Sequence, residues 1–144
     1  MLTANLHDLD LMDMAAPDDT RQACRVTFPL LGAHGTEDTA TVYFELAPGK
    51  NVGRHTDSAE EILVVLDGEV RASVGDETVE AGAGTLLVVP TMVPHDVTNV
   101  GDGTARVLGV FGGANHIVAT FDHGWGPDRM AVVGTKAMTE GAPA

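Results

Sequence analysis

The sequence of 144 residues is 44% hydrophobic and 20% charged, and its formal net charge is −13. This length is enough for one domain with a hydrophobic core, and so apolar a composition excludes an intrinsically disordered chain. The single cysteine, Cys24, excludes a disulfide framework and a cysteine-rich zinc module. An acidic chain without a basic cluster binds nucleic acid and anionic membranes poorly, so we expect neither as a partner.

The first segment, residues 1–24, differs in composition from the rest of the chain. Five aspartates and no Lys or Arg occur in the first 19 residues, where Leu2, Leu6 and Leu9 recur at roughly helical spacing. We therefore expect an N-terminal arm or a short amphipathic helix that ends at Pro17. The segment lacks the basic start of a secretory signal, and no apolar run approaches the roughly 18 residues of a membrane span. We expect a cytoplasmic protein.

Residues 25–121 consist of short β-branched or alternating runs separated by turn signals such as Asp67-Gly68 and Gly101-Asp102-Gly103. The pattern predicts strands at 25–31, 41–46, 61–66, 70–74, 77–80, 85–89, 96–99, 106–111 and 117–121. Because no helical pattern of about a dozen residues lies between them, a parallel α/β sheet is excluded and an all-β sandwich or barrel is expected. The tail, residues 122–144, is expected to pack on this domain or on a partner subunit.

Residues of the types that ligate metals gather at two places in the predicted domain. His55 and Asp57 are two residues apart and therefore project to the same face of an extended segment, and Glu61 has the same parity. His95, after Pro94, is the other candidate. Two imidazoles with one or two carboxylates suit Fe(II), Mn(II), Zn(II), Ni(II) or Co(II). The spacing alone leaves open that Asp57 belongs to an ordinary solvated turn.

Two blocks of sequence resemble the conserved motifs of the cupin superfamily. The first motif is Gly, five residues, His-x-His, three or four residues, Glu, six residues, Gly. The second is Gly, five residues, Pro-x-Gly, two residues, His, three residues, Asn. The matching positions, in register, are Gly49, His55, Glu61, Gly68, Gly84, Pro90, His95 and Asn99. The resemblance covers about a third of the chain and implies a cupin jelly-roll β-barrel of two antiparallel sheets.

The chain departs from the two motifs at Asp57 and Met92. Asp57 replaces the second His of the first motif, which is a metal ligand in the cupin pattern. If Asp57 ligates, the resemblance implies a site of His55, Asp57, Glu61 and His95; if it turns away, two His and one carboxylate remain. Met92 replaces the Gly of the second motif and implies a different loop there.

The resemblance extends to small quercetin-dioxygenase-like cupins, and it implies a divalent metal ion at one end of an apolar pocket. We expect a metal-dependent oxidoreductase of dioxygenase type, or an isomerase or cyclase, acting on a small apolar or aromatic molecule in the barrel. Glu61 is the candidate catalytic residue, as ligand or as general base. The alternative is a non-enzymatic cupin that binds or senses a small molecule without a catalytic metal. By analogy with cupins we also expect a homodimer.

Overall fold

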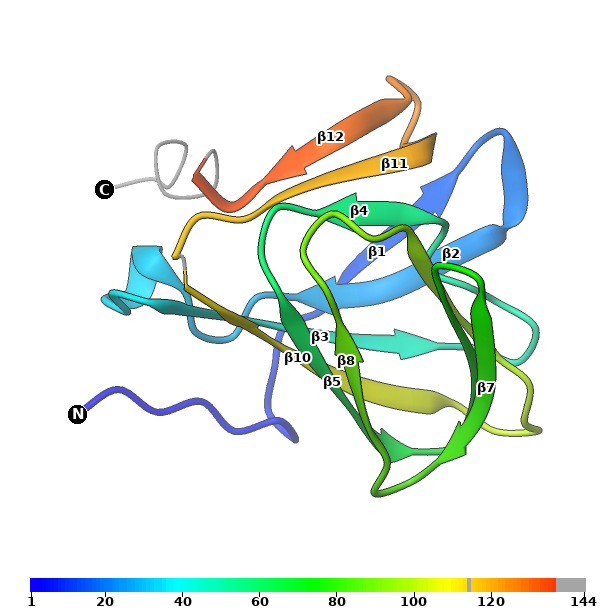
Figure 1. Ribbon diagram of the computed structural model, residues 1–144, viewed down its shortest axis with the longest axis horizontal. Helices are drawn as coiled ribbons and strands as arrows, with labels where there is room; N and C mark the ends of the chain where they lie inside the picture. Colours follow the sequence, from blue (N-terminus) through cyan, green and yellow to red (C-terminus); the bar gives the residue numbers. More distant parts are fainter. Residues whose placement is uncertain (114, 137–144) are drawn as a thin grey trace.

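The computed structural model describes residues 1–113 and 115–136, which form two facing six-stranded antiparallel sheets (Figure 1). The first sheet contains, in spatial order, β1 (Met12–Ala16), β2 (Asp19–Thr27), β3 (Thr39–Leu46), β10 (Ala105–Gly112), β5 (Glu61–Asp67) and β8 (Leu86–Val89). The second contains β12 (Met130–Gly134), β11 (Val118–Trp125), β4 (His55–Asp57), β9 (His95–Asn99), β6 (Glu69–Val74) and β7 (Glu77–Gly82). A short 3₁₀ helix, η1 (Gly32–His34), lies between β2 and β3. The predicted all-β jelly-roll class is confirmed.

Each of the nine predicted runs falls on a strand, with shifts at the ends. The strand predicted at 25–31 begins earlier, as β2, and ends at Thr27. The three strands that the sequence did not predict are β1, β4 and β12, which are short. Within the first 24 residues the structure has no helix; Met12–Ala16 instead pairs with β2, with Met14 opposite Cys24. The helix alternative fails because these apolar residues gain a neighbouring strand, which sequence periodicity does not reveal.

The expected tail begins inside a strand rather than after one. β11 runs through the predicted boundary at residue 121 to Trp125, and β12 pairs with it in antiparallel fashion. Residues 137–144 of that tail lie outside the described residues. The division into residues 1–24, 25–121 and 122–144 remains a prediction.

The core lies between the two sheets, and alternation along each strand decides which side chains enter it. In β10, Ala105, Val107, Gly109 and Phe111 are buried, while the residues between them are half-buried.

On the outer face of the first sheet, the N-terminal segment lies over Tyr43, which is buried. Farther along the same face, exposed apolar side chains stand on β5 and β8: Ile62, Leu86 and Val88. No described helix is long and apolar enough to cross a membrane.

The two sheets approach each other at one side of the molecule, where β1, the edge strand of the first sheet, contacts β11, the second strand of the other sheet (Figure 1). The N–H of Gly126 donates a hydrogen bond to the carbonyl of Ala15 at 2.8 Å. Beside it, Nε of Arg129 lies 2.9 Å from Oδ2 of Asp18. These contacts join the β1–β2 turn to the β11–β12 turn.

Candidate metal centre

The four residues predicted as metal ligands come together between the sheets. His55 and Asp57 are the first and last residues of β4, so both project to the same face of this strand. His95 begins β9 and lies directly opposite His55 in the pairing of these two strands. Glu61 begins β5 and reaches the same place from the other sheet. The i, i+2 parity argument from the sequence therefore matches the observed arrangement of these side chains.

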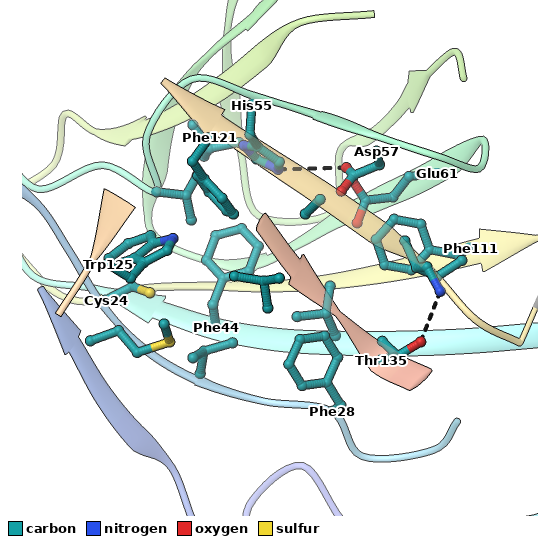
Figure 2. A pocket seen from close by; sticks show the side chains of 18 of the residues that line it. Cys24, Phe28, Phe44, His55, Asp57, Glu61, Phe111, Phe121, Trp125 and Thr135 are labelled. Carbon is teal, nitrogen blue, oxygen red and sulfur yellow. Dashed lines mark hydrogen bonds and ion pairs between the residues drawn. The ribbon is translucent and has the colours of Figure 1, made fainter. Parts of the chain in front are cut away.

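The donor atoms of the cluster lie within a small volume. Oδ2 of Asp57 is 3.0 Å from Nε2 of His95 and 3.5 Å from Nε2 of His55. Ligand atoms of His55, Asp57 and His95 all lie within 4.8 Å of one another, close enough for the three residues to hold one metal ion. Oε1 of Glu61 is 3.6 Å from Nε2 of His95. Asp57 is only 4% exposed and points into the cluster rather than into solvent (Figure 2).

Two atoms of the cluster lack a hydrogen bond although they are buried. Oδ2 of Asp57 and Nε2 of His95 have no hydrogen-bond partner among the described residues, although the two atoms lie 3.0 Å apart. A buried polar atom left unpaired costs about 1–3 kcal/mol. A divalent cation bound by both atoms would remove this cost. The residues present therefore fit a metal ion, and the donor set of imidazole and carboxylate suits a hard or borderline one.

Backbone carbonyls orient both imidazoles of the cluster. Nδ1 of His55 lies 2.7 Å from the carbonyl oxygen of Gly53, and Nδ1 of His95 lies 2.9 Å from that of Val93. Since a carbonyl can only accept a hydrogen bond, each Nδ1 is the protonated donor. The other nitrogen, Nε2, is thereby directed at the carboxylates, as in metal-ligating histidines with a second partner.

Gly53 fixes the approach to β4. Its φ of +90° is a conformation that residues with side chains rarely adopt, and a Cβ there would clash with the side chain of Gln22. Its N–H donates a hydrogen bond to Oδ1 of Asp96 at 3.0 Å. Asp96 therefore supports the loop that aims His55, and sequence reasoning did not single out either residue.

The cluster is electrostatically asymmetric. Burial raises the pKa of Asp57, but the two imidazoles outweigh this effect and the net shift is downward. For Glu61, burial dominates and, together with the charge of Asp57, raises the pKa. Burial lowers the pKa of His95, but the facing carboxylates outweigh it and raise the value to about 10. In the metal-free protein, Asp57 is therefore the ionised carboxylate and His95 its positively charged partner.

Glu61 occupies a space that only a glycine can leave open. A Cβ on Gly109 of β10 would clash with Oε2 of Glu61 and lie 2.8 Å from Cγ1 of Val42. Gly109 pairs with Leu63 of β5, which is two residues from Glu61 and projects to the same face of that strand. The sequence analysis missed this role, because the spacing of Gly109 relates to neither motif.

The cluster forms the polar end of an apolar cavity of about 200 Å³. Aromatic side chains from several elements line it: Phe28, Phe44, Phe111, Phe121 and Trp125 (Figure 2). The ring of Phe121 stacks on His55, with centroids 4.5 Å apart and an interplanar angle of 18°. Trp125 in turn meets Phe121 edge-on at 5.4 Å. The predicted apolar pocket is therefore present, and one wall of it comes from β11.

The turn before His95 differs from the expectation for Met92. Although Met replaces the motif glycine, its φ is +63°, so the left-handed conformation is retained rather than replaced by another loop. The N–H of Met92 donates a hydrogen bond to the carbonyl of Asp57 at 2.9 Å. This bond ties the turn to β4 and holds the backbone in a conformation that costs a non-glycine residue about 1–2 kcal/mol.

Comparisons with known proteins agree with this geometry. The model of the cupin domain family matches residues 42–111, which include all four residues of the cluster. No curated protein matches the sequence.

Solved structures with the same fold include the polyketide cyclase RemF from Streptomyces resistomycificus, at 20% identity and a TM-score of 0.63, covering 78% of this chain and 79% of that one. A predicted oxalate decarboxylase from Thermotoga maritima is 19% identical with a TM-score of 0.66, covering 78% of this chain and 99% of that one. The Cnp3 cupin domain of Schizosaccharomyces pombe is 13% identical with a TM-score of 0.64, covering 78% and 74%. Likeness at this identity concerns the fold alone. Together with the family match and the motif residues, it identifies residues 42–111 as a cupin domain and the chain as a member of the cupin family.

Proposed function

We propose that this cupin binds a divalent metal ion through His55, Asp57, Glu61 and His95 and acts on a small apolar or aromatic molecule in the adjacent cavity. The observation that carries the proposal is the pair of buried donor atoms, Oδ2 of Asp57 and Nε2 of His95, which lie 3.0 Å apart without a hydrogen bond at the polar end of that cavity. Fe, Mn, Zn, Ni and Co all suit the donor set. The bound ion would supply Lewis-acid chemistry and open coordination positions for a substrate oxygen.

In this proposal the residues of the protein orient the ligands, transfer a proton and exclude water. The carbonyls of Gly53 and Val93 keep the two imidazoles aimed at the ion. Glu61, whose pKa is raised by burial, is the catalytic residue, either as a ligand of the ion or, where it does not ligate, as a general base whose carboxylate lies beside the other ligands and the cavity. There it can take a proton from the substrate and return it. The apolar walls exclude water from the reaction.

Two reaction types remain in the proposal, an oxidoreductase reaction of dioxygenase type and an isomerisation or cyclisation. RemF is a polyketide cyclase, and its likeness of fold supports the second type. Oxygen uptake separates the two, because a dioxygenase consumes O₂ with its substrate and an isomerase or cyclase does not. A cytoplasmic location and a homodimer remain predictions, and sedimentation of the purified protein at micromolar concentration tests the dimer.

Elemental analysis tests the metal site. The purified protein is stripped with a chelator, reloaded separately with each of the five ions, and analysed for bound metal. We expect stoichiometric binding that is lost in His95→Ala and weakened in His55→Ala, Asp57→Asn and Glu61→Gln. Glu60→Gln is the matched control, because Glu60 is adjacent to Glu61 but exposed. A protein that acquires none of the ions would instead be the non-enzymatic small-molecule binder.

A further inference from the structure

We propose that the cavity selects an uncharged molecule about the size of a single aromatic ring, and that Asp57 makes it reject small anions. The inference deepens the proposed function by naming the substrate class of the same site. It follows from the charges that line the cavity, from the cavity's size and from the place where its few polar groups lie.

The first step concerns charge. Among the described residues that line the cavity there is no Lys or Arg, and the carboxyl and imidazole groups are those of His55, Asp57, Glu61 and His95. With a divalent cation held by two carboxylates and two neutral imidazoles, the charges of the ion and its ligands cancel. A motif with His in place of Asp57 would leave one positive charge. The aspartate therefore removes the attraction that would bring a carboxylate or phosphate to the ion.

The second step is that an anion gains nothing elsewhere in the cavity. The walls beyond the cluster are aromatic and aliphatic side chains, so a charged group entering the cavity loses its hydration without gaining a cationic partner. The net charge of −13 adds repulsion at long range. Oxalate, the molecule for which one predicted decarboxylase of similar fold is named, is the kind of molecule that this lining disfavours.

The third step concerns size. An apolar cavity of about 150 Å³ binds benzene, and the present cavity encloses about 200 Å³. Phe44, Phe121 and Trp125 surround this space with ring faces and edges (Figure 2). A substituted ring fits such walls because aromatic pairs are favourable in both stacked and edge-on arrangements.

The fourth step concerns the place of the substrate's polar group. Away from the cluster, the wall has a hydroxyl at Thr135, and its Oγ1 accepts a hydrogen bond from the N–H of Ile117 at 2.8 Å. The cluster at the other end is thus where an uncharged oxygen of the occupant, such as a hydroxyl or a carbonyl, would be directed. The occupant would be amphipathic, with one oxygen toward Asp57 and Glu61 and its hydrocarbon part toward Trp125.

The fluorescence of Trp125 tests the inference, because this is the chain's single Trp and it lines the cavity. The probes are benzyl alcohol and benzoate, which share a ring and differ in charge, with oxalate and inorganic phosphate as small anions. We expect benzyl alcohol to change the emission saturably and benzoate to bind at least about tenfold more weakly, with no response to oxalate or phosphate. Equal or tighter binding of benzoate or oxalate would overturn the inference.

Two kinds of variant test whether benzyl alcohol binds in the cavity and whether Asp57 causes the rejection of anions. Ala119→Leu and Ala119→Phe add bulk inside the cavity and should abolish the benzyl alcohol response, with circular dichroism to verify folding. If a folded Ala119 variant still binds benzyl alcohol unchanged, the cavity is not the site. Asp57→His, loaded with Mn²⁺, should gain affinity for benzoate relative to benzyl alcohol; no gain would contradict the role given to Asp57.

The test of ligand charge can fail or succeed independently of the test of metal binding. The titrations are made on metal-free and on Mn²⁺-loaded protein. If no ion binds, the metal proposal fails, while the preference for benzyl alcohol over benzoate is still expected, because the walls are apolar and Asp57 already neutralises the charge of His95. If the ion binds stoichiometrically and benzoate is nevertheless preferred, the metal proposal stands and the inference on substrate charge fails.

Discussion

Gly109 leaves open the space that the carboxylate of Glu61 occupies, although the two residues lie on different strands of the first sheet. The strand that carries Gly109 therefore determines whether this carboxylate can face the two histidines. The geometry of the candidate metal centre therefore depends on Gly109, which has no ligand atom of its own.

Gly109→Ala should displace Glu61 and weaken metal binding by about 10–100-fold, the usual effect of disturbing a group that supports a ligand. The added methyl group should also lower the free energy of unfolding by about 1–3 kcal/mol, because it overpacks the core. Gly112→Ala is the matched control on the same strand, since a Cβ there meets no atom within 4 Å. Metal titration and urea unfolding of both variants check the prediction. Equal metal affinity in the two variants would contradict it.

Metal affinity should rise with pH because the ion displaces a proton from His95. Burial lowers the pKa of His95, but the facing carboxylates outweigh it and raise it to about 10, so the imidazole is protonated at neutral pH. Above the raised pKa of Glu61 and below the pKa of His95 in the folded protein, loss of this proton makes the affinity rise about tenfold per pH unit. At lower pH the metal affinity should change more steeply with pH. Burial raises the pKa of Glu61, so its carboxylate also takes up a proton that the ion must displace.

Titration calorimetry with Mn²⁺ in two buffers of different ionisation enthalpy measures the released protons directly. The Glu60→Gln control should release the same number as the unaltered protein. An affinity that does not change between about pH 5 and about pH 7 would exclude the site as described.

Met92→Gly should stabilise the protein. Glycine adopts the left-handed conformation without strain, which should raise the free energy of unfolding by about 1–2 kcal/mol. The greater freedom of glycine in the unfolded chain offsets part of this gain, so the net increase should be about 0.5–1 kcal/mol. Thr91→Gly is the control, because φ at Thr91 is not positive, and it should destabilise. The midpoints of urea unfolding compare the two. A lower midpoint for Met92→Gly would mean that the exposed Met side chain contributes more than its backbone costs.

Cys24 should resist alkylation in the folded protein. Burial raises the pKa of its thiol to about 12, so almost no thiolate is present at neutral pH. Iodoacetamide should label it slowly under native conditions and rapidly in urea, and mass spectrometry measures both rates. Since the chain has one cysteine, no other thiol contributes to the signal. Fast native labelling would show that the cavity wall at β2 opens to solvent.

The parts of the fold that could be predicted from sequence are those with local physical causes. Three of the motif glycines, Gly49, Gly68 and Gly84, have φ values of 80°, 88° and 91°, so turns that require glycine mark the strand ends. Asn99 could be found from its motif, and Nδ2 donates hydrogen bonds to the carbonyls of Leu46 and Gly103. Strand alternation likewise placed the side chains of His55 and Asp57 on one face.

The parts that could not be predicted depend on contacts between distant segments. β1 has apolar residues at a spacing that suits a helix as well as a strand, and its pairing with β2 decides between them. The stacking of Phe121 on His55 and the space at Gly109 arise only when β11 and β10 reach their neighbours. Met92 was misjudged because its N–H bond to Asp57, and not its own propensity, holds the turn.

The hydrogen bond between Gly126 and Ala15 joins residues near opposite ends of the described chain. β1 can pair with β2 beside it in sequence, but its contact with the β11–β12 hairpin must wait until that hairpin is made, and contacts so far apart in sequence form slowly. Until the hairpin leaves the ribosome, the aromatic wall of the cavity faces water, and partly synthesised chains expose the surface on which aggregates form. In living cells, the step most sensitive to chaperones should thus be the arrival of the last strands, after the metal ligands themselves have been made.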